Sequence, residues 1–118
     1  MSELAALMSA NLRDVFGQRD EAARRAAMAQ IFADDIRFAD HNGVVVGIEG
    51  VNAAIQALQD STPGFVFSEA GPVHEVQDLG TVAWNYGPPD AAPVVSGTDV
   101  VLVTQGRIAS LWVYLTSS

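Results

Sequence analysis

The chain has 118 residues, 49% of them hydrophobic, with no cysteine and a formal net charge of −8. A chain of this length can bury a core without a disulfide or metal, and the lack of cysteine excludes thiol catalysis and cysteine-based zinc sites. All six cationic residues are arginines and 14 residues are acidic, so we expect no nucleic acid and no anionic membrane as a partner.

The N-terminal residues lack the basic segment and the uninterrupted apolar run of a signal peptide. No apolar run along the chain approaches the roughly 20 residues of a membrane-spanning helix. We therefore expect a cytoplasmic protein with one domain over residues 1–118.

The first third of the chain has helical periodicity. Apolar residues recur at spacings of three and four between Leu4 and Phe16, which predicts an amphipathic helix ending at Gly17. Asp20 is a suitable N-cap for a second helix, whose apolar face is expected to run to Phe32.

Three of the six arginines cluster around this second helix. Arg19, Arg24 and Arg25 are expected to form a solvated face that pairs with Asp20 and Glu21. This interpretation gives the cluster no role in binding phosphate.

The periodicity then changes from helix to strand. Alternation over residues 36–40 predicts a strand, Asn42-Gly43 predicts a turn, and residues 51–58 predict a short helix. Five further segments rich in Val, Phe, Trp and Tyr predict strands, with residues 78–80 as a tight turn: 65–70, 73–78, 81–87, 95–104 and 107–115. Helices segregated from a mostly antiparallel sheet indicate an α+β fold.

Two segments carry a resemblance to a known family. Residues 31–40 (IFADDIRFAD) followed by 47–51 (GIEGV), and residues 97–103 (GTDVVLV) followed by 106–112 (GRIASLW), resemble the NTF2-like superfamily, in particular its SnoaL-like and ketosteroid-isomerase-like branches. Together with the order of elements, the resemblance covers nearly the whole chain. It implies a curved sheet wrapped around three helices, forming a cone with an apolar pocket at its open end.

Two aspartates are the candidate catalytic residues. The resemblance places Asp40 where ketosteroid isomerases carry their general base, and Asp99 where they carry a protonated acid that donates to the developing oxyanion. Independently, Asp99 opens an apolar run, so an inward orientation would desolvate it and raise its pKa. The alternatives are that Asp40 only accepts a backbone hydrogen bond in the turn, and that Asp99 faces solvent.

One feature counts against isomerase chemistry. The isomerases place a tyrosine on their first helix as the main oxyanion donor, and the matching position falls near Leu12. The two tyrosines, Tyr86 and Tyr114, both lie on late predicted strands. An acid–base enzyme of the isomerase or cyclase type and a non-catalytic binding module therefore both remain open.

The expected ligand is a small apolar molecule that contains a carbonyl group. The residues expected to line its pocket are Phe16, Phe32, Phe38, Trp84, Tyr86, Leu111 and Val113. Trp112 and Tyr114 alternate with the last two, so we expect them on the outer sheet face, where family members often pair as homodimers.

No cofactor is implied, and no metal site is expected, because the two histidines, His41 and His74, lack the spacing of a metal-binding pair. Hydrolysis of an epoxide or lactone is a further possibility. On the fold that the resemblance implies, this reaction usually needs an Asp-Arg-Asp relay inside the cone. The only arginines predicted outside the helices are Arg37, which alternates away from Asp40, and Arg107, in a predicted turn.

Overall fold

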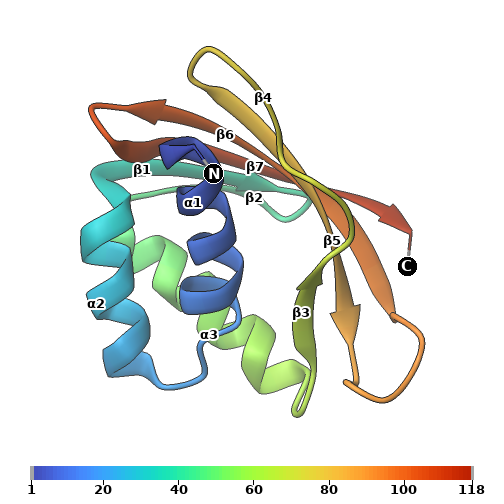
Figure 1. Cartoon of the computed structure of the whole chain (residues 1–118). Helices are drawn as coiled ribbons and strands as arrows, with labels where there is room; N and C mark the ends of the chain where they lie inside the picture. The colour runs from blue at the N-terminus through green and yellow to red at the C-terminus, as the bar shows by residue number, and fades with distance from the viewer. Residues whose placement is uncertain (1, 118) are drawn as a thin grey trace.

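The computed structural model describes residues 2–117 (Figure 1). The helical elements are α1 (Glu3–Ala10), a π-helical segment η1 (Asn11–Phe16), α2 (Glu21–Ile31) and α3 (Ile48–Ser61). The strands are β1 (Phe32–Asp40), β2 (Gly43–Val46), β3 (Val66–Glu69), β4 (His74–Val76), β5 (Leu79–Gly87), β6 (Val95–Thr104) and β7 (Arg107–Ser117). None of the helices within residues 2–117 has the length and apolar character needed to cross a bilayer.

The first predicted helix ends at Gly17 but changes geometry on the way. Ser2 caps α1 by accepting the Ala5 amide through its hydroxyl oxygen. The helix then widens into η1, where the Gly17 amide donates to the Leu12 carbonyl over 2.8 Å, an i→i+5 bond. The wider turn leaves Asn11 and Phe16 both buried.

The second helix also begins as predicted, because the Asp20 carboxylate accepts the Ala23 amide at 3.0 Å. Its predicted end was wrong. Phe32 is the first residue of β1 and pairs with Ile108 of β7. The β1–β7 register shifts between Phe32 and Arg37. Because of this irregularity, the first half of the strand lacks the simple alternation of apolar and polar residues that predicts a strand.

One curved seven-stranded sheet has the order β2-β1-β7-β6-β5-β3, with β4 also paired to β5. Only the β1–β7 pairing is parallel; the other pairings are antiparallel. Figure 1 shows the helices gathered on one face of the sheet. The α+β class and the curved sheet around helices are therefore confirmed.

The turn before β5 lies one position earlier than predicted. Gln77 has a positive φ of 54° and begins the turn, whereas Gly80 belongs to the strand. A Cβ on Gly80 would lie 2.3 Å from Cδ2 of Leu4. The glycine therefore allows α1 to pack closely on β5 rather than making the turn.

The arginine cluster differs from its predicted role as a solvated face. Arg24 is fully buried, and its guanidinium donates to side-chain oxygens of Asn52 and Gln59 on α3. Arg19 donates to backbone carbonyls at the end of α3. Only Arg25 pairs with Glu21 as predicted, and it also pairs with Glu49.

Candidate functional site

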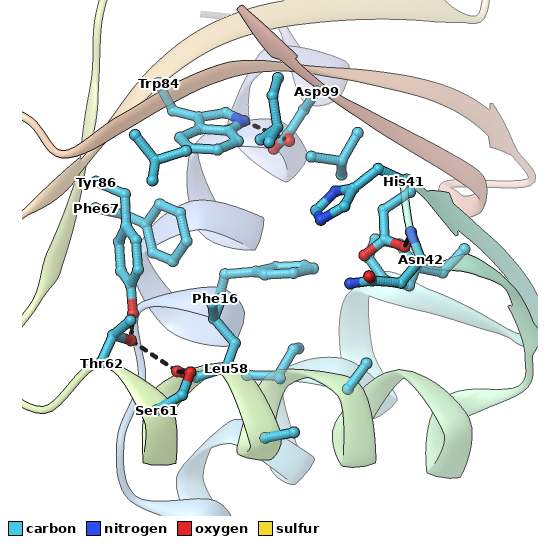
Figure 2. Close-up of a pocket in the computed structure, with 18 of the residues that line it drawn as sticks. Phe16, His41, Asn42, Leu58, Ser61, Thr62, Phe67, Trp84, Tyr86 and Asp99 are labelled. Atoms are coloured by element: carbon cyan, nitrogen blue, oxygen red, sulfur yellow. Dashed lines mark hydrogen bonds between the residues drawn. The ribbon is translucent and has the colours of Figure 1, made fainter. Parts of the chain in front are cut away.

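A cavity of about 710 Å³ lies between the helices and the concave face of the sheet (Figure 2). Its floor comes from α3, and its walls come from η1, the β1–β2 turn and strands β5, β6 and β7. Most of the lining is apolar, and a few polar groups converge on it, as is usual for small-molecule sites. The polar lining residues are Asp40, His41, Asn42, Ser61, Thr62, Trp84, Tyr86 and Asp99.

Asp99 is the buried carboxyl group of this cavity. It is 3% exposed, and Oδ1 accepts a hydrogen bond from Nε1 of Trp84 at 2.9 Å. Burial raises the pKa of Asp99 to about 7, although the hydrogen bonds from Trp84 and Asn11 act to lower it. A carboxyl group of this kind changes charge near neutral pH inside an apolar site.

Gly97 makes the contact between Trp84 and Asp99 possible. Trp84 and Gly97 are directly opposite on β5 and β6, and Asp99 lies two residues further on the same face as Gly97. A Cβ on Gly97 would lie 2.4 Å from Cζ2 of the indole. The missing side chain lets the ring lie over the strand, with its N–H directed at the carboxylate.

Asn11 is the second partner of Asp99 and was not predicted. Its Nδ2 lies 3.4 Å from Oδ2 of Asp99, and its own Oδ1 is buried with no hydrogen-bond partner among residues 2–117. The π-helical segment η1 begins at this residue. Its interruption of the apolar helical stripe was a visible signal, but nothing in the sequence connected it to a strand 88 residues away.

Asp40 lines the cavity at the β1–β2 turn but is engaged there. Its Oδ1 accepts the backbone N–H of Asn42 at 2.8 Å, which is the turn role considered from the sequence. His41 and Asn42 line the same side of the cavity, and Figure 2 shows the His41 imidazole directed into the open space. His41 was not predicted as a site residue.

A third polar group lies at the end of α3. The hydroxyl groups of Tyr86 and Thr62 are hydrogen-bonded to each other, and Thr62 Oγ1 also bonds the Leu58 carbonyl at 2.7 Å. Tyr86 is held by aromatic contacts, stacked on Phe67 at a centroid distance of 4.0 Å and edge-on to Phe65 at 5.2 Å.

Most of the predicted lining residues do face the cavity: Phe16, Phe38, Trp84, Tyr86 and Val113. Phe32 and Leu111 do not line it and are fully buried in the core. Phe32 begins β1 immediately after α2, and Leu111 is paired with buried Phe38 and Val101. Both therefore belong to the packed interior rather than to the open cavity.

The lining residues that the sequence did not predict come from the helices, from the β1–β2 turn with β2, and from strands and loops around β3, β6 and β7. They include Leu12 of η1 and a row on α3 consisting of Ala54, Ile55, Ala57, Leu58 and Ser61. The α3 periodicity predicts an apolar face, but periodicity alone does not say whether that face meets a core or a cavity.

The arginines required for hydrolysis are not in the cavity lining. Arg37 is exposed and alternates away from Phe38, and Arg107 donates to the backbone carbonyls of Ala29 and Phe32. Among the described residues no group of three or more His, Asp or Glu side chains could hold a metal ion.

The curved sheet over helices and the cavity at its open end define the NTF2-like class of fold. The profile of the SnoaL-like domain matches residues 11–111, and the chain belongs to this family. A search of curated proteins found no match.

Solved structures agree with this placement. A candidate isomerase of the SnoaL-like family from Agrobacterium tumefaciens has 27% identity and a TM-score of 0.91, covering 99% of this chain and 100% of its own. A candidate SnoaL-like polyketide cyclase from Jannaschia has 15% identity and a TM-score of 0.79, with coverages of 97% and 85%. A candidate ketosteroid isomerase from Kribbella flavida has 14% identity and a TM-score of 0.70, with coverages of 98% and 79%. The last two comparisons concern the fold alone.

Proposed function

We propose that the chain binds a small apolar ligand that contains a carbonyl group, and that Asp99 acts on this carbonyl as an acid or hydrogen-bond donor. The observation that carries the proposal is a carboxyl group buried in the wall of an apolar cavity, with its pKa raised to about 7. A neutral carboxylic acid in such a site can donate to a carbonyl oxygen, and its donation strengthens as negative charge develops there.

Asp40 is the proposed base. It lies at the rim of the same cavity, where it would remove a proton from the carbon next to the carbonyl or activate a water. Its Oδ1 is occupied by the Asn42 amide, so Oδ2 is the atom that would take the proton. The reaction class is an isomerisation or cyclisation, and the name of the Agrobacterium relative, an isomerase, agrees with the first of these.

A β,γ-unsaturated ketone tests this proposal, because its conversion to the conjugated ketone is followed by ultraviolet absorbance. We expect Asp99→Leu, which leaves no donor at this position, and Asp40→Asn each to slow conversion by about 100-fold or more, as for the loss of one acid, base or oxyanion donor. Asp90→Asn, in the exposed loop between β5 and β6, is the matched control. Unchanged turnover in both site variants would exclude the assignment.

A non-catalytic binding module is the second candidate. The observation that favours it is Leu12, which lines the cavity where the isomerases carry a tyrosine and offers no hydrogen-bond donor. Ketone binding without conversion at any pH between about 5 and 9 would support this candidate over the enzyme.

We also propose a homodimer through the outer sheet face. Trp112 and Tyr114 alternate with cavity-facing Val113, and Tyr114 is 54% exposed. Exposed Val44 and Val46 lie on β2, which is separated from β7 by β1. Tyr114→Glu should convert the dimer to a monomer in sedimentation analysis, and an unchanged mass would contradict this interface.

A further inference from the structure

Two hydroxyl groups satisfy one carbonyl at the C-terminus of α3. Leu58 is among the last four residues of this helix, whose carbonyls lack partners within the helix. Thr62 Oγ1 donates to the Leu58 oxygen at 2.7 Å, and Ser61 Oγ donates to the same oxygen at 2.9 Å. Tyr86 Oη is hydrogen-bonded to Thr62 Oγ1 in turn.

The direction of each hydrogen bond in this network follows from the number of hydroxyl protons available. A carbonyl oxygen carries no proton, so the single hydroxyl proton of Thr62 is directed at Leu58. Thr62 can then only accept from Tyr86, and the Tyr86 proton is used in that bond. Tyr86 Oη therefore has only lone pairs left to offer to the cavity.

Packing holds the tyrosine in this position. Tyr86 is 4% exposed, and Phe67 and Phe65 contact its ring from two directions. Tyr86, Thr62 and Ser61 all line the cavity, and Figure 2 shows their oxygens at its α3 end. We call these three residues the hydroxyl corner.

The surrounding groups add to the accepting character of the hydroxyl corner. The C-terminus of a helix carries partial negative charge. The nearby cation, Arg19, donates to the carbonyls of Gln59, Thr62 and Phe65, whereas the Leu58 carbonyl is left to the two hydroxyl groups.

The hydroxyl corner is distinct from the carboxyl group of Asp99. Trp84, which holds Asp99, and Tyr86 lie on one face of β5 two residues apart, which is about 7 Å along a strand. From one to the other, the apolar lining includes Phe67 and Phe16. A single ligand can therefore contact both polar groups with one apolar body between them.

We propose that the hydroxyl corner is a hydrogen-bond-accepting subsite that selects ligands with a hydroxyl or N–H group at the end of the apolar body remote from Asp99. Combined with the proposed carbonyl contact at Asp99, on which this assignment of ligand class rests, the ligand class is a hydroxy- or amino-substituted ketone.

Calorimetric titration with 4-hydroxybenzophenone and 4-methoxybenzophenone tests the subsite, because the two ketones share the carbonyl and differ in the donor. The ratio of their dissociation constants in Tyr86→Phe gives the preference that remains without the Tyr86 hydroxyl group. We expect the wild type to favour the hydroxy ketone by about 3- to 10-fold more than this variant does, as for one added hydrogen bond. Equal ratios in the two proteins would overturn the subsite.

Thr62→Val distinguishes a hydrogen-bonding role of the hydroxyl corner from a purely structural one. Without the threonine acceptor, the Tyr86 hydroxyl proton becomes free to donate to the methoxy oxygen. The preference for the hydroxy ketone should fall to the Tyr86→Phe ratio or below it. A ratio that stays at the wild-type value would also overturn the subsite.

Asp99→Leu, which offers the carbonyl no donor, separates the subsite from the proposed function. It should weaken both ketones by a similar factor and leave their ratio unchanged. Unweakened binding in this variant would contradict the carbonyl contact at Asp99 while leaving the subsite intact. Failure of the wild type to bind either ketone would overturn both.

Discussion

Trp84 Nε1 donates a hydrogen bond to Asp99 Oδ1 at 2.9 Å, from the strand next to the one that carries the carboxyl group. Among residues 2–117, the indole donates the shorter of the two side-chain hydrogen bonds that this carboxyl group accepts, since the Asn11 amide lies at 3.4 Å. The state of ionisation of the carboxyl group and the environment of the indole are therefore coupled.

This coupling predicts a fluorescence titration. The chain has two tryptophans, so Trp112→Phe leaves Trp84 as the only tryptophan, which is excited selectively above the tyrosine absorption band. Its emission should change with an apparent pKa of about 7, the value for Asp99, because a carboxylate and a neutral acid perturb the indole differently. Asp99→Asn in the same background should abolish the change.

His41 lines the same cavity, so the titration is repeated in His41→Gln. Persistence of the transition there assigns it to Asp99. If Asp99→Asn retains the transition and His41→Gln loses it, the assignment is wrong.

Asp99 also predicts a pH dependence of folding stability. Its pKa is raised on folding from 3.8 to about 7, so between these values the folded chain binds a proton that the unfolded chain has released. The stability contributed by this group is fully present below pH 3.8 and is lost as pH rises to about 7. The loss is about 4 kcal/mol, at about 1.4 kcal/mol for each pH unit.

Other carboxyl groups act in the opposite direction, since the pKa values of Asp14, Glu21 and Glu49 are lowered by their hydrogen-bonded partners. The measurement is therefore the difference in free energy of unfolding between the wild type and Asp99→Asn, from urea unfolding at several pH values. A difference that stays constant between pH 4 and pH 7 would contradict the raised pKa.

Gly97 should tolerate no side chain. In Gly97→Ala the new Cβ would meet the Trp84 indole at 2.4 Å and the Tyr114 carbonyl at 2.6 Å. We expect a loss of about 1–3 kcal/mol in urea unfolding, as for an overpacked core, and loss of the Trp84 titration as the ring leaves Asp99. Gly71→Ala, where a Cβ has no neighbour within 4 Å, is the control. Wild-type behaviour of both variants would refute the steric role of Gly97.

The order of elements could be predicted from the sequence because it depends on local patterns. Asp20 caps α2, as expected from the residues alone. The predicted turn between β1 and β2 is present but one residue earlier, at His41 and Asn42, because Gly43 already pairs with Asp40 as part of β2. The register shift after Phe32 and the close packing of Gly80 on Leu4 depend on distant partners. The predicted boundaries were also wrong at these two positions.

The candidate site shows the same division. The resemblance identified Asp99 and Asp40, and strand alternation identified Trp84 and Tyr86 as cavity residues. The hydrogen-bond partners of these groups, Asn11 as a donor to Asp99 and Thr62 as an acceptor from Tyr86, come from helix ends far away in the sequence. Periodicity carries no information about such pairings.

Arg24 is buried rather than solvated, contrary to the prediction from the sequence. We therefore expect its replacement to lower the free energy of unfolding strongly. Its guanidinium donates to Asn52, Gln56 and Gln59, so Arg24→Met would leave several buried oxygens without donors. We expect a loss of about 3 kcal/mol or more in urea unfolding. The control is Arg25→Met, one position along, which removes only exposed ion pairs and should change stability little. Equal losses in the two variants would contradict the buried role.

Leu12 offers a gain-of-function test of the acid–base chemistry. It lines the cavity from η1, on the helix where the isomerases carry their oxyanion-donating tyrosine. Leu12→Tyr would add a hydroxyl group to the same apolar space as Asp99, so we expect it to speed conversion of a β,γ-unsaturated ketone by at least about 10-fold, as for an added oxyanion donor. Leu12→Phe adds the same ring without the hydroxyl group and should give no such gain. If the two variants convert the ketone at equal rates, the cavity does not stabilise charge on the carbonyl oxygen, and the binding module becomes the better description of this protein.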